Sequence, residues 1–375
     1  MPDREPDDHR SSDPAARVAE LVAAIAEPDA RVAADAAALQ DRLTKPRGAL
    51  GRLETLGIRL CVISGTVPPP VPAKAAVAVF AGDHGVLDEG VSPWPQEVTA
   101  QMVANLCAGG AAINVLARQA GAEVIVVDVG VAGPVLDHPG LRRRRVRSGT
   151  ANLAQGPAMT VTEARSAILV GAEVAADLVA GGADLLVGGD MGIGNTTPSA
   201  ALIAAITGRD PAAVTGRGTG IDDAMLQHKA DVVADAVARV RTAAATGPDA
   251  TGLDAVGLLA EIGGLEIAAL AGFYLGAAAA GVPVVLDGVI ALAAACVAAQ
   301  HCPAVTGYLI AGHRSTEPGA TAALDWLGLE PLVDLGMRLG EGSGAMLGVP
   351  LVRAAAAVMN EMATFDSAGV ADKAE

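Results

Sequence analysis

Short runs of apolar residues alternate with longer stretches of helical periodicity along most of the chain. The runs are VAVF at 77–80, VIVV at 124–127, LLVG at 185–188, PVVL at 283–286 and YLIA at 308–311. Continuous runs of Val, Ile and Leu that are separated by helices are typical of a parallel sheet buried on both faces. The pattern therefore predicts an α/β fold in which helices flank a parallel sheet.

The two ends of the chain follow other patterns. Residues 15–60 place apolar side chains at helical spacing, and the proline-rich segment VPPPVPAK at 67–74 separates them from the first predicted strand. Residues 1–14 and 367–375 are polar, so we expect these tails to be poorly ordered. Helices should therefore precede the sheet.

Composition narrows the class of protein. Of 375 residues, 51% are hydrophobic and only 2% are aromatic, so Ala, Val, Leu and Ile must build the core. The net charge of -16 makes nucleic acid an unfavourable partner. The four cysteines form no C-x-x-C pair and the first residues contain no apolar signal segment, which favours a reducing cytoplasm.

A mean hydropathy of +0.42 raises the question of a membrane span. The longest uncharged stretch, residues 268–286, is rich in Ala and Gly, and Gly281 and Pro283 interrupt it. A membrane helix needs about 20 strongly apolar residues. We therefore predict a buried helix, a turn and a buried strand here, and no membrane partner.

Polar residues and glycines follow each predicted strand. The chain reads AGDHG, DVG, GDMGIG, DG and GHRS at these five places. In open parallel sheets, ligands bind outside the carboxyl ends of the strands. We therefore expect one crevice at this edge of the sheet.

The segment GGDMGIGNTTPSAAL at 188–202 follows a strand and opens a helix. Gly192 and Gly194 allow backbone N–H groups to face an anion, and Asn195 and Thr196 add donors at the helix start. The pattern indicates either a phosphate site or a tight strand-to-helix turn. It matches neither common nucleotide-binding motif.

A second glycine-rich loop, TGRGTGIDD at 215–223, also precedes a helix. Arg217 or Lys229 could supply positive charge to a phosphate there. Taken alone, the loop is better explained as a flexible surface segment.

Glu341 lies between glycines in RLGEGSG, after a predicted strand LVDL at 332–335. Flanking glycines permit close approach of a ligand, and a carboxylate at such a place could accept a proton. The alternative is an ordinary surface carboxylate, which most glutamates are.

The segment at 81–102 combines acid, histidine and aromatic residues. Asp83 and His84 follow a strand, Trp94 suits a flat aromatic ligand, and Gln101 could bind a ring nitrogen. We interpret His84 as a buried structural histidine rather than a metal ligand, because no further ligands have the required spacing.

Three other segments have ordinary explanations. Ser315 could cap a helix or bind an anion, and we interpret RRRRVR at 142–147 as an exposed strand or loop. Glu261 and Glu266 are expected at a helix start, where acidic residues favour the helix dipole.

Taken together, several segments resemble the nicotinate-nucleotide:dimethylbenzimidazole phosphoribosyltransferase family of cobalamin biosynthesis. They follow the family's order over roughly residues 40–366. The matching segments are LTKPRGALGRLE, GDHGV, GVSPWPQEVTAQM, GTANLAQGPAMT, GDMGIGNTTP, GRGTGIDD, EIGGLEIAALAGF, LDGVIALAAA, GHRSTEPG and DLGMRLGEGSGA.

The resemblance implies transfer of the phosphoribosyl group of nicotinate mononucleotide to 5,6-dimethylbenzimidazole, giving α-ribazole 5′-phosphate and nicotinate. It implies no cofactor and no metal. It also implies a homodimer of two-domain subunits. A Rossmann-like large domain would span residues 71–345, and a smaller helical domain would combine residues 15–70 and 346–366.

Residue by residue, the resemblance gives the role of catalytic base to Glu341. The implied phosphate and ribose site contains Gly192, Ile193, Gly194, Asn195, Thr196, Gly218, Lys229, Ser315 and Gly342. The implied base pocket contains Asp83, His84, Ser92, Trp94, Gln101, Met191 and Leu339. Where the family often has Glu, this chain has Asp190, which would be a second catalytic carboxylate with a reach one methylene shorter.

Two alternatives remain open. A relative could prefer another acceptor, such as adenine, plain benzimidazole or a phenolic compound. A non-catalytic protein could sense nicotinate mononucleotide, although the intact Glu341 and both glycine-rich loops favour an enzyme.

Overall fold

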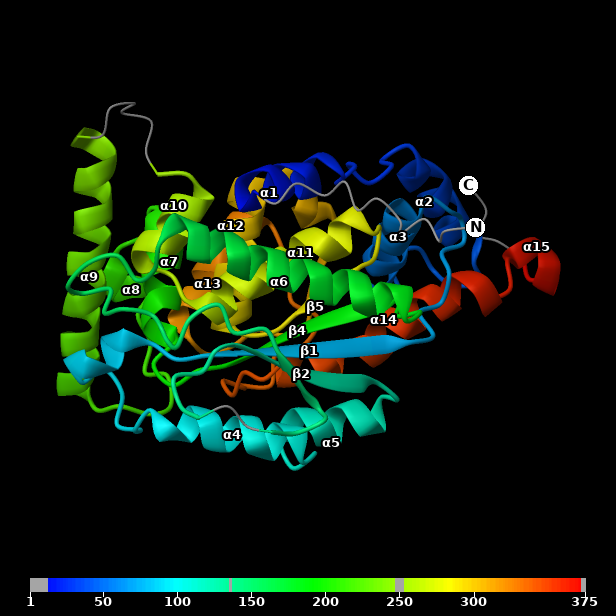
Figure 1. The fold of residues 1–375 in the computed structure, drawn as a ribbon. Coiled ribbons are helices and arrows are strands. Elements are labelled where there is room, and N and C mark those ends of the chain that lie inside the picture. Colours follow the sequence, from blue (N-terminus) through cyan, green and yellow to red (C-terminus); the bar gives the residue numbers. More distant parts are fainter. Residues whose placement is uncertain (1–12, 135–136, 247–252, 372–375) are drawn as a thin grey trace, which may run out of the picture.

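A six-stranded, fully parallel sheet forms the centre of the computed structural model, which describes residues 13–134, 137–246 and 253–371 (Figure 1). The strands are β1 (Ala75–Gly82), β2 (Glu123–Gly130), β3 (Leu141–Arg143), β4 (Leu185–Met191), β5 (Val284–Leu286) and β6 (Leu309–Ala311). Their order is β3-β2-β1-β4-β5-β6. This order is that of a doubly wound sheet, whose direction of winding reverses between β1 and β4. The predicted α/β fold is confirmed.

Helices and two 3-10 turns connect the strands. Their bounds are α1 (Pro14–Ala23), α2 (Val32–Arg42), α3 (Arg52–Ser64), η1 (Gly85–Glu89), α4 (Glu97–Cys107), α5 (Ala112–Gln119), α6 (Val161–Ala180), α7 (Thr196–Thr207), α8 (Pro211–Val214), α9 (Asp223–Thr246), α10 (Ala255–Ile262), α11 (Leu265–Ala279), α12 (Val289–His301), η2 (Pro303–Tyr308), α13 (Pro318–Leu327), α14 (Ser343–Glu361) and α15 (Phe365–Ala368).

The core has two parts, one on each face of the sheet. Helices α11 and α12 cover one face, with α6 packed outside α11, while α4, α5 and α14 cover the other (Figure 1). All eight residues of β1 are buried, and alternate side chains such as Val79 and Phe80 enter opposite cores. Glycine permits the tight packing of α6 on α11, because a Cβ at Gly171 would lie 1.7 Å from the carbonyl oxygen of Ala269.

The predicted interruption at residues 268–286 is confirmed as buried helix α11, a turn and strand β5. Two other segments, Glu97–Gln119 and Ser343–Glu361, are long and apolar enough to cross a membrane. The first contains α4 and α5, and both segments contact strands of the sheet. We therefore interpret them as core helices.

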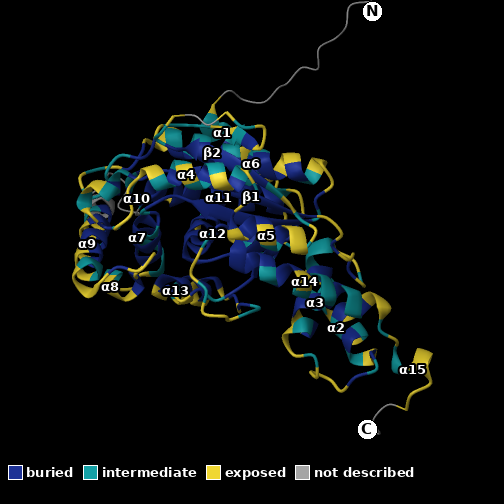
Figure 2. Ribbon diagram, turned by 90° about the horizontal axis from the view of Figure 1, so that it is seen from below, coloured by how far each residue is buried: buried dark blue, intermediate teal, exposed yellow. Residues whose placement is uncertain are grey.

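Helices α2 and α3 pack together, and α3 packs on α14, so elements from both chain ends form a projection beside the sheet (Figure 2). Helix α1, in contrast, packs on α6 and α11. The division into two domains stays a prediction. Of the predicted tails, residues 1–12 and 372–375 lie outside the described residues, whereas Pro14 begins α1 and residues 367 and 368 complete α15.

The predicted strand at 332–335 is wrong. Val333 forms only an isolated parallel bridge with His313, and Leu335 is 64% exposed. The segment extends the sheet edge by a single residue pair and then continues as an exposed loop. Its apolar residues therefore imitate a strand pattern without forming a ladder.

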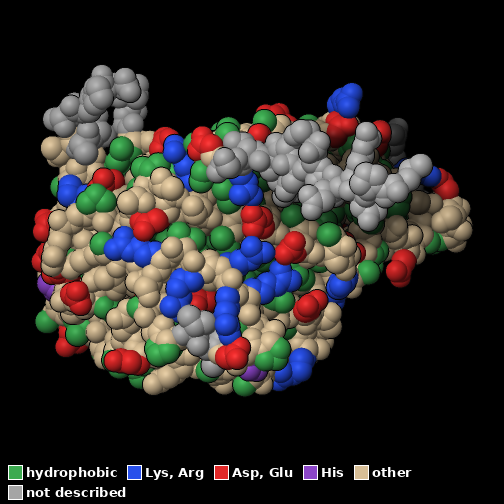
Figure 3. Space-filling model, viewed as in Figure 1, with side chains coloured by type: hydrophobic (Ala, Val, Ile, Leu, Met, Phe, Trp, Pro, Cys, Tyr) green, Lys and Arg blue, Asp and Glu red, His purple; other side chains and the backbone are tan. Residues whose placement is uncertain are grey.

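The arginine-rich run contains the end of edge strand β3 and the loop after it. Arginines gather with acidic side chains on one face of the molecule (Figure 3). Arg142 pairs with Asp177, and Arg144 with Glu173. Acidic partners thus neutralise part of the run, which agrees with its interpretation as an exposed strand or loop.

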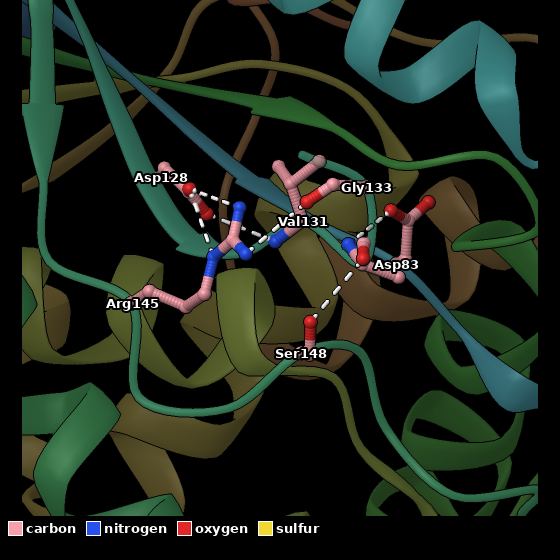
Figure 4. Close-up of polar contacts among 7 residues, drawn as sticks. Asp83, Asp128, Val131, Gly133, Arg145 and Ser148 are labelled. Atoms are coloured by element: carbon pink, nitrogen blue, oxygen red, sulfur yellow. Dashed lines mark hydrogen bonds and ion pairs between the residues drawn. The ribbon is translucent and has the colours of Figure 1, made fainter. Parts of the chain in front are cut away.

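Arg145 has a structural role at the end of β2 (Figure 4). Its Nε and Nη2 atoms donate to Asp128 Oδ2 over 3.1 and 2.8 Å, and Val131 N donates to Asp128 Oδ1 over 2.9 Å. The next backbone N–H, that of Ala132, donates to Asp83 Oδ2 over 2.7 Å. The ion pair of Arg145 and Asp128 therefore fixes the loop that contacts Asp83, the residue after β1.

Candidate active site

A cavity of about 420 Å³ lies at the carboxyl ends of the strands, as predicted. Its lining comes from six segments of the chain. They are residues 91–102, 190–196, 217–229, 288–290, 313–317 and 338–341, each contributing some of its side chains or backbone.

The loop from β4 to α7 forms the floor of the cavity. A Cβ at Gly192 would lie 2.3 Å from the carbonyl oxygen of Gly82, and Gly194 has a φ of +87°, so both positions require glycine. Ile193 N donates to the buried Thr99 hydroxyl over 3.1 Å. The loop brings the start of α7, at Thr196, to the cavity, where backbone N–H groups and the helix dipole favour an anion.

Lys229 adds a positive charge to this start of α7. Its side chain is buried, and Nζ donates to Thr196 Oγ1 over 2.7 Å and to the Gly216 carbonyl over 3.1 Å. Burial lowers the pKa of Lys229 to about 8, while Glu317 opposes the shift. A phosphate bound here would meet both a helix start and an ammonium group.

The second glycine-rich loop is fixed from two sides. Gly218 N donates to Glu317 Oε1 over 2.8 Å, and the Gly218 carbonyl accepts from Arg338 Nη1 over 2.7 Å. The loop is therefore no loose surface segment, contrary to its ordinary interpretation. Glu317 and Arg338 both line the cavity, and no local signal in the sequence marks either role.

Glu341 lies in an unusual backbone conformation. Its φ is +65°, the only positive φ of a non-glycine residue in the described part of the chain, and Gly340 and Gly342 beside it are also positive. Such strain clusters at functional sites. The carboxyl group is buried and accepts a long bond, 3.4 Å, from Ile113 N. Burial raises the pKa of Glu341, and nearby Asp287 raises it further.

Asp287, at the end of β5, holds the Glu341 loop. Its Oδ2 accepts from Gly342 N over 3.1 Å, and its Oδ1 accepts from Gly344 N and Ala345 N over 2.7 and 2.9 Å. It thereby caps α14, whose own N-cap is a glycine. His313 Nε2 lies 3.3 Å from Asp287 Oδ1. Sequence reasoning missed this role of Asp287.

Asp190 lines the same cavity as Glu341. Burial raises the pKa of Asp190 well above its ordinary range, and the charges of Asp287 and Glu266 raise it further, while Asn195 Nδ2 opposes by donating to Oδ2 over 3.0 Å. A Cβ placed on Gly340 would lie 3.2 Å from Asp190 Oδ2, so the carboxyl group lies beside the Glu341 loop.

An apolar wall completes the cavity. Trp94, Val98 and Met102 come from the segment after β1, and Met191 and Leu339 face the same space. Trp94 is 50% exposed and Leu339 is 58% exposed. Such a wall suits a flat apolar ring.

Most of the residues implied by the resemblance line the cavity. These are Glu341, Asp190, Met191, Gly192, Ile193, Gly194, Asn195, Thr196, Gly218, Lys229, Ser315, Ser92, Trp94 and Leu339. Among the described residues, the lining does not include Asp83, His84, Gln101 or Gly342.

These four residues lie outside the cavity lining and make other contacts or face the solvent. Asp83 is buried and accepts from Ala132 N, and Gln101 is exposed on α4. His84 Nε2 lies 2.7 Å from Glu266 Oε1, and burial of this pair agrees with the structural interpretation of His84. Gly342 supports the site indirectly, through its N–H bond to Asp287.

Of the two glutamates expected at a helix start, Glu266 lies in the first turn of α11, as predicted, and is buried against His84. The expectation for Glu261 is wrong. Glu261 lies near the end of α10, because the glycines at 263 and 264 separate α10 from α11. Its side chain pairs with Arg239. In the described part of the chain, no group of three or more His, Cys, Asp or Glu side chains could hold a metal ion.

Comparison with known proteins agrees with this geometry. Residues 25–370 match the model of a family described as phosphoribosyltransferase. The nicotinate-nucleotide–dimethylbenzimidazole phosphoribosyltransferase of Salinispora tropica is 56% identical over 94% of this chain and 98% of its own length. The protein of that name from Roseiflexus sp. is 52% identical over 96% of this chain and 99% of its own length.

A solved structure shares the fold as well. The crystal structure of CobT from Thermus thermophilus superposes with a TM-score of 0.87 at 51% identity, covering 92% of this chain and 100% of that one. Both the matched family model and these relatives span nearly the whole chain. The chain therefore belongs to the nicotinate-nucleotide–dimethylbenzimidazole phosphoribosyltransferase family of transferases.

Proposed function

We propose that this enzyme transfers the phosphoribosyl group of nicotinate mononucleotide to 5,6-dimethylbenzimidazole, with Glu341 as general base. The products are α-ribazole 5′-phosphate and nicotinate. The names of its relatives support the donor and the acceptor. The observation that carries the proposal is a buried carboxylate, Glu341, in one cavity with an anion site and an apolar wall.

The anion site holds the donor. The start of α7 at Thr196 and the ammonium group of Lys229 bind the 5′-phosphate. The Gly218 loop, fixed by Glu317 and Arg338, closes over the ribose side. Holding the phosphate at one end places C1′ toward the apolar wall, and such positioning can supply a large part of the rate.

The acceptor ring lies against the apolar wall, beside Trp94 and Met102. One ring nitrogen attacks C1′ on the face opposite nicotinate, so a C1′–N bond forms as the bond to nicotinate breaks with its electron pair. The β linkage becomes an α linkage. The other ring nitrogen then loses its proton to Glu341, which restores a neutral azole.

Its surroundings suit Glu341 for this step. Burial and the charge of Asp287 raise the pKa of the carboxyl group, which strengthens it as a proton acceptor. Asp190 lies beside the loop of Glu341 and serves as the second carboxyl group. Burial raises the pKa of Asp190 well above its ordinary range, so this carboxyl group also holds a proton more strongly than an exposed aspartate does.

The variant Glu341→Gln tests the base. Its side chain is nearly isosteric, so we expect a normal circular dichroism spectrum and unchanged binding of nicotinate mononucleotide by calorimetry. Because a general base contributes about a hundred- to ten-thousand-fold, nicotinate release should fall by that factor. Near wild-type release by the variant would contradict the role of Glu341.

A panel of acceptors tests the substrate. Dimethylbenzimidazole, benzimidazole, adenine and a phenol compete for one pool of donor, and mass spectrometry resolves the products. Dimethylbenzimidazole should give the dominant product. If another member of the panel gives the dominant product, that compound is the preferred acceptor. The proposed transfer of the phosphoribosyl group would still hold.

A further inference from the structure

The residue that holds the Glu341 loop is distant from it in the sequence. Asp287 directly follows β5, whereas Glu341 precedes α14 by two residues, so the fold alone brings them together. Asp287 is 1% exposed, and its carboxylate accepts three backbone N–H bonds of 2.7 to 3.1 Å from residues on the far side of Glu341. A buried carboxylate without such partners would be costly, so these bonds fix both groups.

The backbone of Glu341 is closely packed on both sides. A Cβ at Gly189 of β4 would lie 2.2 Å from the Glu341 carbonyl oxygen, so the loop rests directly on the strand. On the other side, a Cβ at Gly344 would lie 2.1 Å from the ring of His313. The conformation with φ of +65° thus persists because strand β4, His313 and Asp287 determine it together.

Asp287 also sets the charge around Glu341. Among the described residues, other ionisable groups lie in this region: Asp190 on β4, Glu266 and Tyr274 on α11, and His313 in the segment after β6. On the side of α5, the group facing Glu341 is the neutral N–H of Ile113. The charge of Asp287 raises the pKa of Glu341, and three hydrogen bonds keep Asp287 beside the loop. The charge of Glu341 in turn raises the pKa of Asp190.

We propose that Asp287 is the positioning residue for the base of the transfer reaction: through its three backbone hydrogen bonds it anchors the Glu341 loop and keeps a carboxyl group beside that loop. This inference rests on the proposed function of Glu341. A side chain that only stabilised the fold would leave the proton affinity of Glu341 unchanged, and this difference makes the role testable.

The test compares Asp287→Asn with wild type. The amide is the same size but uncharged, and its NH₂ group opposes one of the backbone N–H donors. We expect kcat to fall roughly ten- to hundredfold, the effect of misplacing a reacting group by about an ångström. KM for nicotinate mononucleotide should stay within about twofold, because the phosphate site is held by other residues.

The pH profile supplies the second readout. Activity is lost as pH falls through the pKa of the base, and removal of a neighbouring negative charge lowers that pKa. The acidic limb of kcat/KM should therefore move to lower pH in Asp287→Asn. An acidic limb at the wild-type position in a folded Asp287→Asn would overturn the proposal.

Asp184→Asn is the matched control. Asp184 also accepts two backbone N–H bonds, from Ala73 and Lys74 over 2.8 Å each, but it lies at the amino end of β4, away from the cavity. This variant should lose stability and keep the wild-type acidic limb. A shift of the limb in the control as well would show that the shift reports general loosening, and would also overturn the proposal.

A double variant separates this proposal from the function on which it rests. If Asp287 acts through Glu341, Asp287→Asn should cause little further loss of kcat in the Glu341→Gln background. If the two single variants lose kcat by factors that multiply in the double variant, the role of Asp287 is contradicted. Full activity of the single variant Glu341→Gln contradicts the role of Glu341 as base. If Asp287→Asn does not fold, Asp287→Glu takes its place in the cycle: it keeps the charge, and its loss of kcat must vanish in the Glu341→Gln background.

Discussion

At the scale of single residues, the site depends on partners that are distant in sequence. The place of Glu341 in the cavity was predictable because its glycine-flanked motif is local and matches a family pattern, while its role as base stays a prediction. The roles of Asp287 and Glu317 were not, because their hydrogen-bond partners lie 55 and 99 residues away. Such a contact exists only once the sheet has brought the strand ends together.

Lys229 leads to a prediction about alkaline pH. Its pKa of about 8 means that the ammonium group, and with it the attraction for the 5′-phosphate, is lost as pH rises through that value. We expect kcat/KM for nicotinate mononucleotide to fall above this pKa in the wild-type enzyme. In Lys229→Arg, whose guanidinium stays charged, the alkaline limb should disappear although activity is lower throughout. A limb that persists unchanged in this variant would assign it to another group.

At the scale of elements, the apolar runs predicted five of the six strands. They missed β3, because a three-residue edge strand that ends in arginines has no apolar run to mark it. They added a false strand at 332–335, where the apolar residues instead precede an exposed loop. Periodicity reports burial, so it fails where a strand is exposed or where a loop is apolar.

Strand β4 offers a test that separates stability from catalysis. A Cβ at Gly189 would meet the backbone of Glu341, which cannot yield without moving the loop, whereas a Cβ at Gly188 would meet the ends of the Leu270 and Tyr274 side chains on the opposite face. Both Gly189→Ala and Gly188→Ala should lower the melting temperature. Only Gly189→Ala should reduce kcat strongly, by about a hundredfold. Equal kcat values for two folded variants would show that the loop tolerates displacement.

At the scale of the whole molecule, a parallel sheet covered by helices was predictable from the pattern, whereas the strand order and the arrangement of the chain ends were not. Helices α2 and α3 join α14 beside the sheet, while α1 packs on α6. Helical periodicity shows that a helix has an apolar face but not which partner covers it. The predicted smaller domain of both chain ends therefore remains a prediction.

The expected homodimer belongs to this scale. Two of the most exposed large apolar residues, Trp94 and Leu339, line the cavity, and the exposed Leu335 precedes Leu339 by four residues. Exposed apolar side chains at one place often mark a protein interface. Light scattering after size exclusion should give twice the chain mass of 37.1 kDa. A single-chain mass at micromolar concentration would contradict the dimer.

The division of the cavity walls has a consequence for how such an enzyme can diversify. The groups to which we assign the phosphate come from the β4–α7 loop, the start of α7 and α9, whereas much of the apolar wall comes from one continuous stretch, residues 91–102. In the proposed reaction, separate segments of the chain therefore bind the donor and the acceptor. Substitutions confined to residues 91–102 can therefore change which ring the enzyme accepts, while the donor site and the position of Glu341 stay the same.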